Sequence, residues 1–132
     1  MKKFCLFVVI ALSLMTPVLA QTDVKISRPE FSQSPTAKYR LFPTQNIWTF
    51  IKLDTSNGKL WVVQFSMNHE NRFEVPLSTT PRCSTDGAKN GRFTLYSTSN
   101  IYTFIMLDQT SGKLWQVQWG NRNEDLMVMN IN

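Results

Sequence analysis

Residues 39–65, YRLFPTQNIWTFIKLDTSNGKLWVVQF, recur at residues 93–119 as FTLYSTSNIYTFIMLDQTSGKLWQVQW. The two stretches align without a gap at an offset of 54 residues, and 15 of the 27 aligned pairs are identical. Similarity at a fixed internal offset is the signature of a duplicated structural unit. We therefore predict two copies of one unit in this chain.

Each copy has the pattern of four antiparallel strands joined by short turns. In copy one the strand-like segments are 39–42, 47–53, 59–65 and 72–77, and copy two repeats them 54 residues later. Between the second and third segments lies DTSNG in copy one and DQTSG in copy two. The aspartate of such a loop can accept hydrogen bonds from backbone amides, and the glycine can adopt the positive φ that closes a hairpin.

The predicted fold class is all-β. We expect two tandem four-stranded antiparallel meanders that form a pseudo-twofold eight-stranded barrel or sandwich. Alternation along the strands places a set of aromatic and β-branched residues on one face of each meander, and we expect this face to be core. In copy one the set is Trp48, Phe50, Trp61, Val63 and Phe65; in copy two it is Tyr102, Phe104, Trp115, Val117 and Trp119.

The N-terminal segment is typical of an export signal. Residues 1–20 combine Lys2 and Lys3, a short apolar run and a small-residue cleavage pattern ending at Ala20. We predict a flexible lead-in at 21–37, with an edge strand at 24–26, and a single β domain at 38–132. This domain consists of repeat 1 (38–77), a connector (78–91) and repeat 2 (92–131). The expected location is the periplasm or the cell exterior, without stable membrane insertion after cleavage.

The net charge and the cysteine content limit the kinds of partner that we expect. Removal of Lys2 and Lys3 lowers the formal net charge from +5 to +3, and the remaining basic residues form no run, so we expect no nucleic-acid partner. Cys83 is the one cysteine outside the signal segment. It can form no internal disulfide, and the sequence leaves open whether it is buried, free or bridged to another chain.

No residue pattern indicates catalysis, a metal or a cofactor. His69 is the only histidine, and it lies in a polar loop without a second metal-ligating side chain nearby in sequence. Asp54 and Asp108 repeat symmetrically, but their place in the hairpin loops explains both. We therefore predict a protein that is not an enzyme.

A binding module accounts better for the repeated aromatic and amide residues. Flat aromatic rings beside amide side chains suit a sugar, since rings stack on its C–H groups and amides bond its hydroxyls. The candidate ligand-binding residues are Trp48, Tyr102, Asn46, Asn100, Gln64 and Gln118. The alternative for the tryptophans is a role in the core. Carbohydrate or envelope glycan is the first ligand class; the alternative function is a protein-interaction or inhibitor domain that acts on an envelope or secreted partner.

Two resemblances bear on the fold. The unit F-x-L-x-x-T-x-N-x-[WY]-x-F-x-x-L-D-x-x-x-G-K-x-W-x-V-Q, over residues 39–119, resembles a tandem repeat of uncharacterised small exported bacterial proteins and implies no function. Residues 53–61, LDTSNGKLW, are similar to the hairpin of quinoprotein-type β-propeller blades. A blade is a four-stranded meander, and two blades cannot close a ring. This likeness implies two blades completed by oligomerisation, as in small fucose-binding lectins; the long connector favours a self-contained fold instead.

Overall fold

The computed structural model describes residues 34–131, which belong to one compact unit. The predicted signal segment, the predicted edge strand at 24–26 and most of the lead-in lie outside the described residues. Within them the chain forms eight strands and three single-turn 3-10 helices. None of the described helices has the length and apolar character needed to cross a membrane. The all-β prediction is confirmed.

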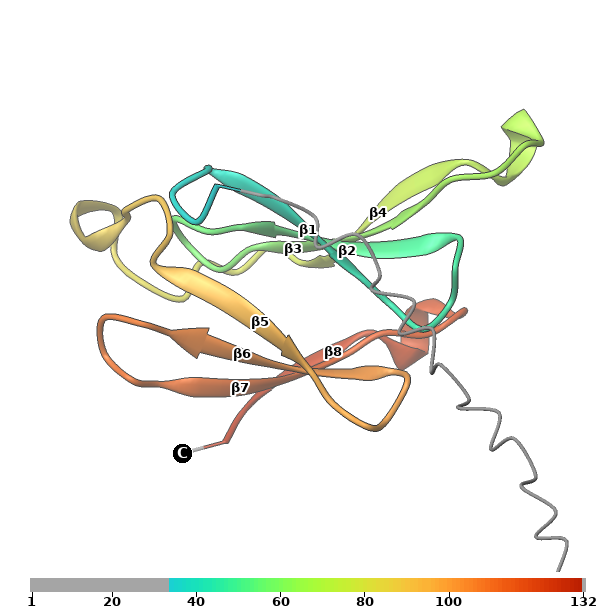
Figure 1. The fold of residues 1–132 in the computed structure, drawn as a ribbon. Helices are drawn as coiled ribbons and strands as arrows, with labels where there is room; N and C mark the ends of the chain where they lie inside the picture. The colour runs from blue at the N-terminus through green and yellow to red at the C-terminus, as the bar shows by residue number, and fades with distance from the viewer. Residues whose placement is uncertain (1–33, 132) are drawn as a thin grey trace, which may run out of the picture. The chain divides into compact units, whose positions relative to one another are not determined.

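The eight strands form two separate four-stranded antiparallel meanders (Figure 1). Sheet 1 contains β1 (Tyr39–Pro43), β2 (Thr49–Asp54), β3 (Leu60–Gln64) and β4 (Phe73–Ser78). Sheet 2 contains β5 (Phe93–Ser97), β6 (Thr103–Asp108), β7 (Leu114–Gln118) and β8 (Met127–Asn130). The 3-10 turns are η1 (His69–Asn71), η2 (Thr85–Gly87) and η3 (Asn123–Asp125). In each sheet neighbouring strands are consecutive in sequence, and no barrel closes.

The hairpin between the second and third strands has the predicted geometry in both copies. Leu53 pairs with Leu60, and the equivalent residues of sheet 2 pair in the same register. Gly58 has φ +80° and Gly112 has φ +76°, and the amide of each donates to the backbone oxygen of the aspartate four residues before it. Only glycine adopts this left-handed conformation at no steric cost, which is why it recurs at this position.

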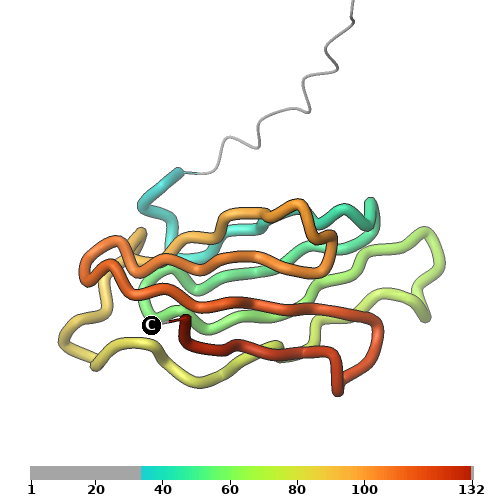
Figure 2. Tube along the Cα trace, turned by 90° about the horizontal axis from the view of Figure 1, so that it is seen from below, coloured from blue at the N-terminus to red at the C-terminus, as the bar shows by residue number. Residues whose placement is uncertain are grey.

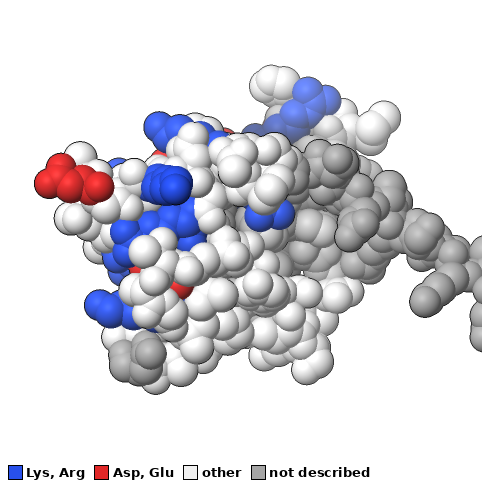
Figure 3. Space-filling view, turned by 60° about the vertical axis from the view of Figure 1, so that its left-hand side comes forward, with Lys and Arg blue, Asp and Glu red and all other residues white. Residues whose placement is uncertain are grey.

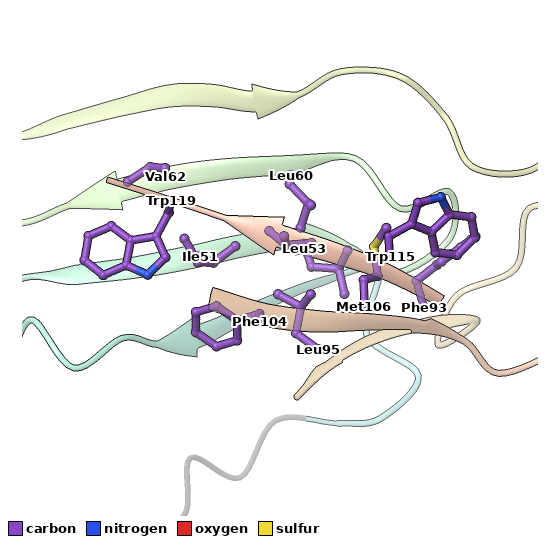
Figure 4. Close-up of a cluster of buried hydrophobic side chains, with 11 residues drawn as sticks. Ile51, Leu53, Leu60, Val62, Phe93, Leu95, Phe104, Met106, Trp115 and Trp119 are labelled. Atoms are coloured by element: carbon purple, nitrogen blue, oxygen red, sulfur yellow. The ribbon is translucent and has the colours of Figure 1, made fainter. Parts of the chain in front are cut away.

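The core lies between the two sheets (Figure 4). Sheet 1 contributes four buried aliphatic residues: Ile51, Leu53, Leu60 and Val62. Sheet 2 and the residue after it contribute larger, mostly aromatic side chains: Phe93, Leu95, Phe104, Met106, Trp115, Val117 and Trp119. Burial of such side chains stabilises the fold by about 1.5–3 kcal/mol each, before the entropy cost of ordering them.

The two sheets bury opposite faces. We call the face that carries the predicted aromatic set the front face of a sheet, and the other its back face. The front face of sheet 2 packs on the back face of sheet 1. The prediction of an aromatic core is therefore right for most of sheet 2, although Tyr102 stays 42% exposed. It is wrong for sheet 1, where Trp48 and Phe65 are 41% and 47% exposed.

This packing also corrects the predicted twofold relation. A twofold axis would bury equivalent residues, whereas Trp115 is buried and its equivalent Trp61 is only half-buried. Figure 2 shows that both sheets advance from first to last strand in the same direction. Contacts between β4 and β8 agree with that view. The second copy is thus stacked on the first in the same orientation, front to back, and only one of the two aromatic faces can be covered.

Thr55, in the β2–β3 loop, joins the two copies through its hydrogen bonds. Its amide donates to Lys38 O at 2.8 Å, and its own backbone oxygen accepts from Phe93 N at 2.8 Å. The hydroxyl donates to Ala37 O at 2.7 Å and accepts from Gly91 N at 2.9 Å. This fully buried threonine therefore ties the start of sheet 1 to the start of sheet 2.

Candidate ligand-binding groove

A groove of about 460 Å³ lies at one end of sheet 2. We call it the loop groove, because it opens between the β5–β6 turn and the β7–β8 loop. Its lining comprises Asn100, Tyr102, Gln118, Trp119, Gly120, Asn121, Arg122 and Asp125. The fold thus brings together three of the six predicted binding residues, namely the three of copy two: Asn100, Tyr102 and Gln118.

The β5–β6 turn is held by its own side chains. Thr98 Oγ1 accepts from Asn100 N at 3.1 Å and donates to Thr103 O at 3.0 Å. Asn100 Oδ1 accepts from Tyr102 N at 3.0 Å. Threonine and asparagine favour such turns because their short side chains bond backbone groups two residues away. The turn presents the Tyr102 ring beside Trp119, with 5.4 Å between ring centroids.

Trp119 anchors the far wall of the groove. It is buried, and its Nε1 donates to Ile101 O at 3.2 Å while its amide donates to Tyr102 O at 2.9 Å. The indole N–H is therefore satisfied within the protein. Tyr102 is the aromatic side chain of the groove that keeps a large exposed surface.

The β7–β8 loop folds back on itself next to this wall. Arg122 donates to both oxygens of Asp125, at 3.2 and 2.9 Å, and these hydrogen bonds lower the pKa of the Asp125 carboxyl. A Cβ at Gly120 would lie 2.5 Å from Asp125 Cβ, so only glycine permits this close approach. The loop thus adds an ion pair at the rim of the groove.

The groove contains polar groups that have no hydrogen-bond partner in the described part of the chain. Within residues 34–131, three side-chain groups make no hydrogen bond to the chain: the Gln118 side-chain amide, Asn100 Nδ2 and the Tyr102 hydroxyl. The equivalent of Gln118 in copy one behaves differently, since Gln64 Nε2 donates to Asn71 O at 3.0 Å. Copy two therefore retains donors and acceptors that a ligand can use.

The copy-one residues lie apart from this groove. Asn46 Oδ1 accepts from Trp48 N at 3.0 Å, which repeats the turn of copy two. Trp48 packs on Phe65 with 5.2 Å between ring centroids, at the front face of sheet 1. Neither these residues nor Gln64 lines the loop groove.

Sequence reasoning missed the loop residues Gly120, Asn121, Arg122 and Asp125. A signal was present, because the copies diverge there: copy one reads SMNHEN at 66–71 and copy two reads GNRNED at 120–125. A loop that departs from an otherwise well-kept repeat is a reasonable place to look for a specialised role.

Both hairpin aspartates are structural. Asp54 accepts from Ser56 N and Ser56 Oγ at 3.0 and 2.6 Å. Asp108 is buried and faces Arg92, whose Nε and Nη2 lie 2.9 and 2.8 Å from its two oxygens. Burial opposes ionisation of Asp108, but the hydrogen bonds from Arg92, Ser111 and neighbouring amides outweigh it and lower the pKa of the carboxyl well below its usual value.

The other side chains considered for chemistry are His69 and Cys83. His69 is exposed in η1, and Cys83 is a half-buried free thiol, 3.5 Å from Ser56 O. No group of three metal-ligating side chains occurs in the part of the chain that is described.

Folding collects basic side chains that the sequence spreads out. Figure 3 shows Lys and Arg side chains close together on the side of the molecule that it presents, with acidic groups among them. Part of the basic charge of the protein is paired, as in Arg92–Asp108 and Lys52–Glu74.

Comparison of the chain with protein-family models, with curated proteins and with solved structures finds no match.

Proposed function

We propose that this protein is an exported, non-enzymatic binding module whose ligand is a carbohydrate or envelope glycan. The observation that carries the proposal is the loop groove, in which the exposed Tyr102 ring stands beside Asn100 Nδ2 and the Gln118 side-chain amide, which have no hydrogen-bond partner among residues 34–131. The apolar ring face suits sugar C–H groups, and the amides suit hydroxyls.

The size of the groove supports a small polar ligand. Its volume of about 460 Å³ lies within the range of about 300–1,000 Å³ that is usual for small-molecule sites. The Arg122–Asp125 pair at the rim offers a second set of hydrogen-bonding groups. Such a lining, polar with one large exposed ring, favours a glycan over an apolar ligand.

Binding is tested by titration calorimetry against a panel of glycans and peptidoglycan fragments. For a ligand that binds, Tyr102→Ala should weaken the affinity about tenfold, because a ring stack of about 1.4 kcal/mol is lost. Trp48→Ala is the matched control, since Trp48 is the equivalent residue outside the groove and its loss should leave the affinity unchanged.

Two results would contradict this proposal. One is a panel without any ligand that binds more tightly than millimolar. The other is equal weakening by Tyr102→Ala and Trp48→Ala, which would place the ligand elsewhere.

A protein-interaction domain is the second candidate function. It is favoured by the exposed aromatic side chains on the front face of sheet 1, among them Trp48 and Phe65, because a flat apolar surface of this kind is typical of contacts between proteins. The two functions are compatible, since the face and the groove lie on different sheets.

A further inference from the structure

Among the described residues, no sheet packs on the front face of sheet 1, whereas the same face of sheet 2 is buried. In sheet 2 this face forms the core, through Phe104, Trp115 and Trp119. In sheet 1 the equivalent residues are Phe50, Trp61 and Phe65, and each keeps part of its surface exposed.

Within residues 34–131, the back face of sheet 2 likewise has no sheet packed on it. Its counterpart in sheet 1 is the fully buried set around Ile51, Leu53 and Leu60. The back face of sheet 2 carries Ile105, Leu107 and Leu114 at these positions, half-buried, and it continues into Tyr96 and Met129, which are 54% and 46% exposed. No charged residue occupies this face within β5 to β8. An outer sheet face that meets water normally alternates to polar residues.

The chain already contains the contact that would cover both faces. Its internal interface is a front face packed on the back face of the same kind of unit. We propose that copies of this protein associate head to tail, with the front face of sheet 1 of one chain on the back face of sheet 2 of the next. The partner is thus a second copy of the chain, and the contact repeats the one between the two sheets.

The front face of sheet 1 carries polar side chains at positions where sheet 2 is apolar, and we expect this difference to limit the strength of the contact. Lys52 and Glu74 form an ion pair on the front face of sheet 1, where sheet 2 has Met106 and Val128. The Lys52 ammonium also lies over the Trp61 ring, 4.6 Å from its centroid. Covering this pair costs desolvation. We therefore expect association that is weaker than the internal packing and depends on protein concentration.

Head-to-tail contacts close into rings or continue as filaments. Rings of stacked four-stranded blades close with about four to eight blades. Two units per chain would then give rings of roughly two to four chains.

The test uses the purified exported protein under reducing conditions, so that Cys83 forms no bridge. Sedimentation velocity should show a mass above that of the monomer, increasing with concentration. Val63→Lys places a charge in the middle of the front face of sheet 1, and Ile105→Lys does so on the back face of sheet 2. Each variant should lose the associated species, whereas the exposed loop variant Met67→Lys should keep it. Thermal melting verifies that all three remain folded.

Mixing the two face variants separates this arrangement from other modes of association. Each retains the surface that the other has lost, so an equimolar mixture should form a one-to-one dimer. A wild-type protein that stays monomeric up to about millimolar concentration, where a contact worth only about 4 kcal/mol would appear, overturns the proposal. So does a folded variant pair in which only one member dissociates, because a symmetric contact uses a single face. The glycan titration does not depend on either result.

Discussion

Asp54 and Asp108 hold equivalent hairpins, but their surroundings differ at one position. Asp108 faces Arg92, whereas the residue equivalent to Arg92 in copy one is Lys38. Arg92 also donates to Gly87 O at 2.6 Å, so the ion pair links the connector to the β6–β7 hairpin. The arginine fork satisfies both carboxylate oxygens at once, which a lysine cannot do.

Asp108→Asn should lower the free energy of unfolding by about 2–3 kcal/mol at neutral pH, because charge-assisted hydrogen bonds are lost. The pKa of Asp108 is lower in the folded than in the unfolded protein, so its ionisation stabilises the fold above about pH 4 and this contribution is lost as the pH falls further. Melting temperatures of wild type and variant should therefore converge between about pH 4 and pH 2. A difference that stays constant over this interval would contradict the assignment.

Thr55 illustrates how a single hydroxyl can matter for the connection between copies. Thr55→Val keeps the shape of the side chain but leaves Gly91 N without its acceptor. We expect a loss of about 1–3 kcal/mol in urea unfolding, the usual cost of a buried unsatisfied donor. Thr80→Val, at an exposed position, is the control and should change stability little; equal effects at both positions would rule out the hydrogen bond as the cause.

Among the elements, the β7–β8 loop shapes the candidate site most directly. Gly120→Ala would force the new Cβ against Asp125, whose Cβ lies 2.5 Å from that position. We expect a loss of about 1–3 kcal/mol from overpacking, with faster amide hydrogen exchange at Asp125 and Leu126, whose N–H groups close the η3 turn. Asn121→Ala, an exposed position in the same loop, should leave exchange at both amides unchanged. Protection that survives in Gly120→Ala would show that the loop adapts.

The strands and hairpins were predictable because each is specified locally. Alternation, the DxxxG loops and the 54-residue repeat gave all eight strands to within two residues at either end. The candidate site was predictable only in part. The repeated residues Asn100, Tyr102 and Gln118 meet in the groove, but the loop that completes it differs between the copies and follows no repeat.

At the scale of the whole molecule, alternation alone could not tell which face of each sheet is buried, because both faces are largely apolar. The differences between the copies carried that information. Lys52 replaces Met106 and Glu74 replaces Val128 on the front face, while Gln116 replaces Val62 on the back face. Each polar member lies on an outer surface. Reading the substitutions between copies, rather than the identities, would have indicated front-to-back stacking.

A fold in which all units have the same orientation always presents a face on which one more unit can pack. A sandwich with twofold symmetry is complete with two sheets, because each face has used its only partner. Here a further duplication would supply a third unit with a face that fits the exposed one and would leave another exposed face behind it. Unequal crossing-over within such a gene could therefore lengthen the protein one unit at a time, and laboratory fusion of a third repeat would reproduce that step.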